Sequence, residues 1–326
     1  MKTLKTTIFM MLATVAFSAC NSEEEATQPT AQMKIEQDTY NINESMTVHF
    51  TGNAENVVIY PGDSGHDYEL REQSNTGLVV NKGLFTYAYT TPGVYKVVCL
   101  VTNHSNEGQV VLRDTCSAYV RVKDDVTELE RISAPAVYYD EVFADPIGGG
   151  NWLMALPRKL LYKNKTLTVP LTQKLKFYIA SSTSTIAIDG ADFSSTTKYN
   201  LGSTHEITVT SNEGNVASYK LLTLNYAIFK SFSLLGATGT LGYSEYDYST
   251  YTMNVKVPAG SDISAVAPKF AMTGTNESAF INGVEQTSGV TKVDFTRPVT
   301  YTLIATHPEN PEVKLETTVT VNVTFE

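Results

Sequence analysis

The chain has 326 residues, of which 42% are hydrophobic and 18% charged, and its formal net charge is −10. This apolar content is enough to build real cores, which excludes a largely disordered chain. The acidic balance argues against nucleic acid as a partner. Strand-forming residues such as Val, Thr and Tyr are abundant and no long stretch has a helical apolar period, so we predict an all-β fold.

Residues 1–19 have the pattern of a bacterial export signal. Lys2 and Lys5 precede an apolar run, Ile8 to Phe17, which is too short to span a bilayer. The following Ser18-Ala19-Cys20 resembles the lipobox of bacterial lipoproteins. This resemblance implies cleavage before Cys20 and attachment of lipid to its thiol, which would anchor the mature chain in the outer membrane.

An acidic tether is expected over residues 20–32. Its first part contains Ser22, Glu23, Glu24 and Glu25, and its end is rich in Thr, Gln, Ala and Pro, as in a flexible linker. The acidic cluster resembles the surface-export signal of Bacteroidota lipoproteins, which implies that the protein faces the cell exterior. The alternative is that these charges only keep the tether solvated.

The first folded domain is predicted over residues 33–124. Short alternating segments indicate strands at 47–50, 57–60, 86–89 and 94–101, and Pro92-Gly93 forms a turn signal before the last. The segments 58–71 and 85–97 resemble the polycystic-kidney-disease (PKD) type of immunoglobulin-like domain, in particular the modules at the N-termini of Bacteroidota surface lipoproteins. The resemblance implies a small β-sandwich in a protein that accompanies an outer-membrane glycan-uptake system.

Two cysteines lie within this domain. Cys99 and Cys116 fall in two strand-like runs joined by a turn near Asn103–Gly108, so a hairpin could place them opposite each other. The export compartment permits oxidation. Because the bond also needs suitable geometry, a disulfide and a pair of buried thiols both fit the pattern, and either role is structural.

The remaining residues contain a weak internal repeat. Ile188-Asp189-Gly190 recurs as Ile281-Asn282-Gly283, and Lys176-Phe177 recurs as Lys269-Phe270 at the same spacing. Upstream, Leu167-Thr168-Val169-Pro170 parallels Val255-Lys256-Val257-Pro258. We therefore predict two further β-sandwich domains, at 125–225 and 226–326, and a chain of tandem immunoglobulin-like sandwiches.

No catalytic constellation is evident. The five histidines are scattered singly, no glycine-rich phosphate loop follows a strand, and no nucleophile-elbow motif occurs. Asp63, Asp67 and Glu69 are close in sequence but lack the spacing of a calcium loop, and a structural turn is preferred there. The sequence predicts a protein that is not an enzyme and uses no metal or cofactor.

Aromatic residues in two loops are the best indication of a ligand site. Flat rings stack on sugars while amides bind the hydroxyls. The first group is Trp152, the only tryptophan, with Tyr138, Tyr139 and Asn151 nearby, and the second is Tyr243, Tyr246 and Tyr248, the latter two expected on one face of a strand. The alternative is that these rings fill cores.

The combined prediction is a surface lipoprotein that captures polysaccharide for an outer-membrane uptake system, in contact with a glycan transporter complex. An adhesin or structural stalk without glycan binding is the alternative. Exposed rings at the two aromatic groups would favour glycan capture, and buried rings would favour the stalk.

Overall fold

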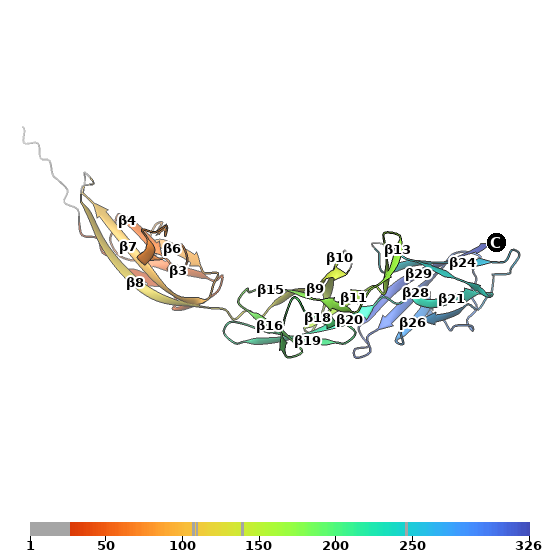
Figure 1. Cartoon of the computed structure of the whole chain (residues 1–326). Helices are drawn as coiled ribbons and strands as arrows, with labels where there is room; N and C mark the ends of the chain where they lie inside the picture. Colours follow the sequence, from red (N-terminus) through yellow and green to blue (C-terminus); the bar gives the residue numbers. More distant parts are fainter. Residues whose placement is uncertain (1–26, 106–107, 109, 138–139, 245–246) are drawn as a thin grey trace, which may run out of the picture. The chain divides into compact units, whose positions relative to one another are not determined.

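The computed structural model describes residues 27–105, 108, 110–137, 140–244 and 247–326. Strands dominate it, and the one helical element in these residues is a short 3-10 turn, η1 (Tyr68–Leu70). The chain divides into two compact units, unit one up to Lys123 and unit two from Asp124 to Glu326 (Figure 1). No helix among the described residues is long and apolar enough to cross a membrane. The predicted all-β fold is confirmed.

Unit one is a sandwich of two sheets. A three-stranded sheet has the order β1-β3-β6, and a five-stranded sheet has the order β2-β8-β7-β4-β5. Inward-facing side chains such as Met46, Val48 and Val97 alternate with exposed ones and form the core between the sheets. The strands are β1 (Met33–Ile35), β2 (Thr39–Asn41), β3 (Ser45–Phe50), β4 (Asn56–Tyr60), β5 (Leu78–Val79), β6 (Leu84–Ala88), β7 (Gly93–His104) and β8 (Val111–Lys123).

The segment between β4 and η1 is a hydrogen-bonded turn. Asp63 accepts a bond of 2.6 Å from the Tyr87 hydroxyl, and its other oxygen lies 2.9 Å from His66 Nδ1. Gly62 has a φ of +89°, and a Cβ there would lie 2.5 Å from the Lys96 carbonyl oxygen, so only glycine fits. The acidic residues of this segment therefore organise a turn against β6 and β7.

Unit two contains two sandwiches. In the middle sandwich, eight strands follow the order β15-β9-β10-β11-β20-β19-β16-β17, and the pairs β12-β13 and β14-β18 are added to it. Its strands are β9 (Leu129–Val137), β10 (Asp140–Gly148), β11 (Asn151–Leu156), β12 (Lys159–Tyr162), β13 (Lys165–Thr168), β14 (Thr172–Lys174), β15 (Lys176–Ile179), β16 (Thr185–Ile188), β17 (Ala191–Asp192), β18 (Lys198–Asn200), β19 (His205–Thr210) and β20 (Val216–Asn225).

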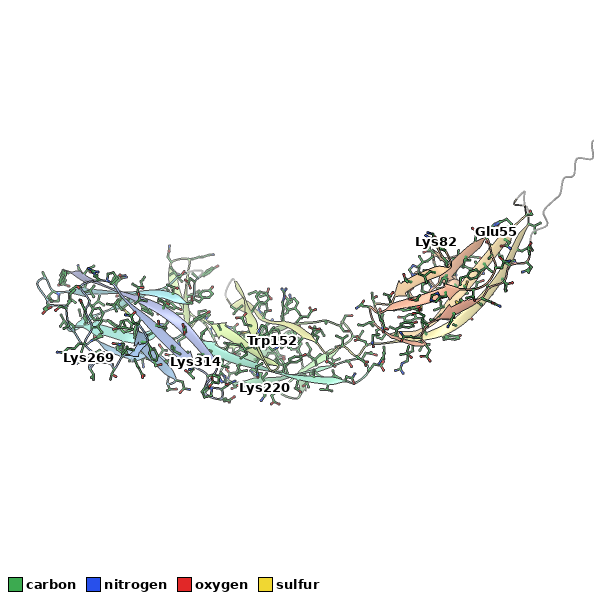
Figure 2. The ribbon with its side chains drawn as sticks, turned by 180° about the vertical axis from the view of Figure 1, so that it is seen from behind. Glu55, Lys82, Trp152, Lys220, Lys269 and Lys314 are labelled. Atoms are coloured by element: carbon green, nitrogen blue, oxygen red, sulfur yellow. The ribbon has the colours of Figure 1, made fainter. Side chains whose placement is uncertain are left out.

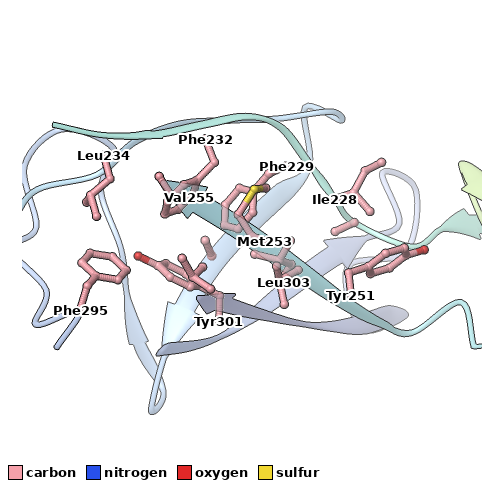
Figure 3. Packing of buried hydrophobic residues seen from close by; sticks show 14 of the residues in the cluster. Ile228, Phe229, Phe232, Leu234, Tyr251, Met253, Val255, Phe295, Tyr301 and Leu303 are labelled. Carbon is pink, nitrogen blue, oxygen red and sulfur yellow. The ribbon is translucent and has the colours of Figure 1, made fainter. Parts of the chain in front are cut away.

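The last sandwich has one sheet of order β22-β21-β25 and another of order β23-β24-β29-β28-β26-β27. Aromatic and aliphatic side chains, among them Phe232, Phe295 and Tyr301, fill the space between the two sheets (Figure 3). The strands are β21 (Phe229–Leu234), β22 (Ala237–Thr238), β23 (Thr240–Gly242), β24 (Thr250–Val257), β25 (Lys269–Met272), β26 (Glu277–Ile281), β27 (Val284–Glu285), β28 (Val299–Thr306) and β29 (Lys314–Phe325).

The two sandwiches of unit two share a strand plan. In the middle sandwich β11 runs parallel to β20, and in the last sandwich β24 runs parallel to β29. The hairpins β16-β17 and β26-β27 turn at Asp189-Gly190 and Asn282-Gly283, whose four φ angles are all positive, between +50° and +80°. The Asx-Gly repeat of the sequence therefore marks the same tight turn in both.

One part of the proposed repeat is misaligned. The strand that corresponds to Val255-Lys256-Val257-Pro258 is β11, which ends at Leu156-Pro157, because β11 and β24 hold the same place beside β20 and β29. Leu167-Thr168 instead belongs to the hairpin β12-β13. That hairpin has no counterpart in the described part of the last sandwich, and its own Val-Pro ending imitates the end of the true strand.

Candidate functional site

The β12-β13 hairpin bridges the two sandwiches of unit two. Its two-residue turn, Lys163-Asn164, has positive φ at both positions, as a type I′ hairpin requires. Leu160 on its inner face is fully buried in the middle sandwich. Leu161 donates its backbone N–H to the Ser244 carbonyl of the last sandwich, at 3.3 Å. Figure 1 shows the hairpin rising beside the last sandwich.

A buried ion pair lies at the base of this hairpin. Arg158 pairs with Glu277 of β26, whose side chain is only 3% exposed. Glu277 also accepts a hydrogen bond of 2.8 Å from the backbone N–H of Gly274. A Cβ at Gly274 would lie 2.5 Å from the Glu277 carboxylate, so a larger residue there would displace the side chains of the pair. Removing either charge would leave the other uncompensated in a desolvated place, which ties the two sandwiches together.

Between the hairpin and the last sandwich lies a cleft of about 560 Å³. Three cations line it, namely Arg158, Lys159 and Lys230, and none of the described residues lining it is acidic. Hydroxyl groups and the amide of Asn225 line the same cleft as Tyr243. This combination of a ring and convergent polar groups in a concave site is suited to binding a small polar ligand.

Tyr243 is the predicted aromatic residue that the structure brings to this cleft. Its ring is half-buried and meets the buried Tyr251 edge to face, with centroids 5.8 Å apart. Burial raises the pKa of the Tyr243 phenol above its usual value, so the hydroxyl stays neutral at physiological pH and can both donate and accept.

Trp152 is not an exposed platform, contrary to the binding prediction. Only 7% of the residue is exposed, and it faces the core of the middle sandwich together with Met154 and Leu156 (Figure 2). These three residues alternate along β11, so the strand turns all of them inward. Tyr251, which is buried near the start of β24, occupies the corresponding place in the last sandwich.

The other predicted ligand residues have different positions. The Asn151 amide donates to the Gly148 carbonyl at 3.0 Å and so holds the β10-β11 turn. Tyr248 is half-buried and packs against the core of the middle sandwich, so it joins the two sandwiches. It lies in a loop and not in the predicted strand. Tyr138, Tyr139 and Tyr246 lie outside the described residues, as do Cys20, Ser22, Glu23, Glu24 and Glu25.

The loop around Tyr248 has a local cause. Asp247 accepts hydrogen bonds from the backbone N–H groups of Ser249 and Thr250, at 2.8 and 3.1 Å. Such an Asx turn competes with strand pairing, and β24 begins only at Thr250.

Cys99 and Cys116 are direct cross-strand partners on β7 and β8. Both are free thiols in this structure, and Cys99 is fully buried. Burial raises the pKa of the Cys99 thiol to about 12. Burial also raises the pKa of the partly buried Cys116 thiol, so the protonated form of both thiols is favoured at neutral pH. Among the described residues, no group of three or more His, Cys, Asp or Glu side chains could hold a metal ion.

Sequence reasoning missed the cations of the cleft. Two of them begin the β12-β13 hairpin and the third lies near the start of β21, and nothing in their local motifs links them. A signal was present in the charge distribution, because residues 146–188 contain six Lys or Arg and no Asp or Glu.

Two family models match parts of the chain. Residues 230–322 match the family described as "SGBP, N-terminal", and residues 19–87 match a "Domain of unknown function (DUF5017)". The SGBP match spans most of the last sandwich, including Lys230, Tyr243 and Glu277. The chain matches no curated protein.

Solved structures that this chain is similar to include the I-band fragment I67-I69 from titin, with 12% identity, 92% of this chain and 99% of that chain covered, and a TM-score of 0.21. A second is the SGBP-B of a Bacteroides ovatus mixed-linkage glucan utilization locus in complex with a mixed-linkage heptasaccharide, with 10% identity, coverage of 91% and 71%, and a TM-score of 0.20. At these scores the likeness carries no argument about function.

Proposed function

We propose that the chain binds glycan, through the cleft between the β12-β13 hairpin and the last sandwich. The observation that carries this proposal is the match of residues 230–322 to the SGBP family, because that segment supplies one wall of the cleft, including Lys230 and Tyr243. The half-buried Tyr243 ring would stack on a sugar face, and the hydroxyl and amide groups that line the cleft would bind the sugar hydroxyls.

The test is isothermal titration of the chain lacking residues 1–20 against a polysaccharide panel. Tyr243→Ala should weaken binding of any ligand found by about tenfold, since stacking of an aromatic ring is worth about 1 kcal/mol or more. Tyr119→Ala is the matched control, because Tyr119 is 66% exposed and lies in unit one. No heat with any polysaccharide, or equal losses for both variants, would refute the proposal.

We also propose a cellular location for the protein. A lipidated Cys20 would hold the chain at the outer membrane, and the acidic cluster that follows would direct it to the cell exterior, where it would deliver polysaccharide to a transporter complex. Labelled palmitate should enter the wild-type chain and not Cys20→Ser, and protease added to intact cells should remove the folded units. Protection from protease on intact cells would contradict surface exposure.

A structural stalk or adhesin is the second function, and burial of Trp152 favours it. Trp152, which could have formed a platform, lies in a core instead, and tandem sandwiches are suited to spacing. The titration panel separates the two functions, because a stalk gives no heat with glycans.

A further inference from the structure

Positive charge is concentrated at the candidate cleft. The chain as a whole is acidic, with 34 Asp and Glu against 24 Lys and Arg, yet the 43 residues from 146 to 188 contain six cations and no carboxylate. The hairpin that forms one wall of the cleft lies within this stretch and begins with Arg158 and Lys159. The opposite wall contributes Lys230.

Two of the three positive charges in the cleft have no acidic partner among the described residues. Arg158 is neutralised by Glu277, but no ion pair involves Lys159 or Lys230 among the residues that the structure describes. Both lysines are exposed. A concave site with low-dielectric walls concentrates the field of such charges, so the cleft attracts anions although the protein as a whole repels them.

We infer that the cleft selects acidic oligosaccharides, with Lys159 and Lys230 binding carboxylate or sulfate groups while the Tyr243 ring stacks on a sugar. This inference rests on the proposed glycan binding and names its substrate class. A ligand that carries both an anionic group and a sugar ring would use the lysines as well as the Tyr243 ring. Charge-assisted hydrogen bonds from the lysines would give anionic sugars a higher affinity than neutral ones.

The experiment compares oligogalacturonate and chondroitin sulfate oligosaccharides with neutral galactan and glucan oligosaccharides, by isothermal titration of the chain lacking residues 1–20. The acidic sugars should bind more tightly, by about tenfold, and their affinity should fall as NaCl rises from about 50 to about 500 mM. The carboxylated and sulfated arms identify which anionic group the cleft prefers.

A charge-matched pair of variants assigns the effect to the cleft. Lys159→Gln with Lys230→Gln should reduce affinity for the acidic sugars by about tenfold and remove most of the salt dependence. Lys269→Gln with Lys314→Gln removes the same charge from exposed positions of the last sandwich that do not line the cleft (Figure 2), and should change neither.

The outcomes separate this inference from the proposal beneath it. Equal affinity for acidic and neutral sugars, lost in Tyr243→Ala and unchanged in Lys159→Gln/Lys230→Gln, would overturn the acidic selectivity and keep glycan binding. Equal losses in both double-lysine variants would also overturn it, because the effect would then come from net charge. No binding of any sugar would overturn both.

Discussion

At the residue scale, unit two begins with a buried carboxylate. Asp124 is fully buried and accepts hydrogen bonds from the hydroxyls of Ser181 and Thr183 and, at 3.0 Å, from the Val126 backbone N–H. Desolvation raises its pKa, but these bonds to the charged form outweigh it and hold the pKa of Asp124 below the usual range.

Asp124→Asn should therefore destabilise unit two by about 2 kcal/mol at neutral pH. Because the folded pKa is depressed, the contribution is present above the unfolded value of about 3.9 and is lost as pH falls through the folded pKa. Urea titrations followed by the fluorescence of Trp152, the only tryptophan, should show the difference between wild type and variant shrinking as the pH falls below about 3.9. Asp192→Asn, at an exposed site, should leave the midpoint unchanged, and a pH-independent difference would contradict this account.

Glu277→Gln removes the charge that Arg158 faces. Stability of unit two should fall by about 3 kcal/mol, since the arginine loses its counter-ion in a largely buried place. Differential scanning calorimetry measures this as a lower transition for unit two with that of unit one unchanged. Glu316→Gln in β29, where the side chain is exposed, is the control. Equal shifts for the two variants would mean that the ion pair does not join the sandwiches.

The cysteines give a prediction in unit one. Because burial raises the pKa of Cys99 to about 12, thiol reagents should react very slowly at neutral pH in the folded protein. In a Cys20→Ser chain, unfolding in urea without reductant should expose two reactive thiols. Absence of reaction after unfolding would show a disulfide, and rapid reaction of both thiols before unfolding would contradict the burial of Cys99.

At the scale of elements, two equivalent hairpins allow a matched experiment. Gly190 and Gly283 have φ of +80° and +78°, and a Cβ at either would meet no atom within 4 Å. Gly190→Ala and Gly283→Ala should therefore each lower the free energy of unfolding by about 1 kcal/mol, because the only cost is the strain of holding alanine at a positive φ. Calorimetry of the two single variants measures this. A cost at only one position would mean that the two turns are not equivalent.

The same elements show what the sequence could predict. Asp189-Gly190 and Asn282-Gly283 determine their turns locally, so the hairpins and the all-β class were accessible from sequence. The hairpin at Lys159–Thr168 was not, because its Val-Pro ending copies that of a true strand. The cleft was inaccessible for a related reason: Arg158 and Glu277 are 119 residues apart, and only the folded sandwiches bring them together.

The burial of aromatic residues also could not be predicted from the sequence. Trp152 lies beside three glycines in the sequence, which suggested a loop, but Gly148 to Gly150 only turn the chain between β10 and β11. The position of Trp152 on the inner face of β11 depends on pairing with β20, which is far away in the chain. Tyr243 was identified from its loop, while the lysines that share its cleft were not.

At the scale of the whole molecule, the two compact units predict that unit two is self-sufficient. A fragment of residues 124–326 should fold, bind any ligand with the affinity of the longer chain, and show the same Trp152 fluorescence midpoint, since its cores and the cleft lie within it. Calorimetry and titration of the fragment test this. A large loss of affinity would mean that unit one contributes to the site.

The longest ladder of unit one has a mechanical consequence. β8 pairs with β7 through twelve consecutive residue pairs and then leads directly into Asp124, whose carboxylate is bound within unit two. Tension applied to the chain at Lys123 therefore loads β8, which is held to β7 by all twelve of these pairs. With the proposed anchor at Cys20 and the proposed polymer capture by unit two, this ladder would carry the drag on the polymer without unit one unravelling.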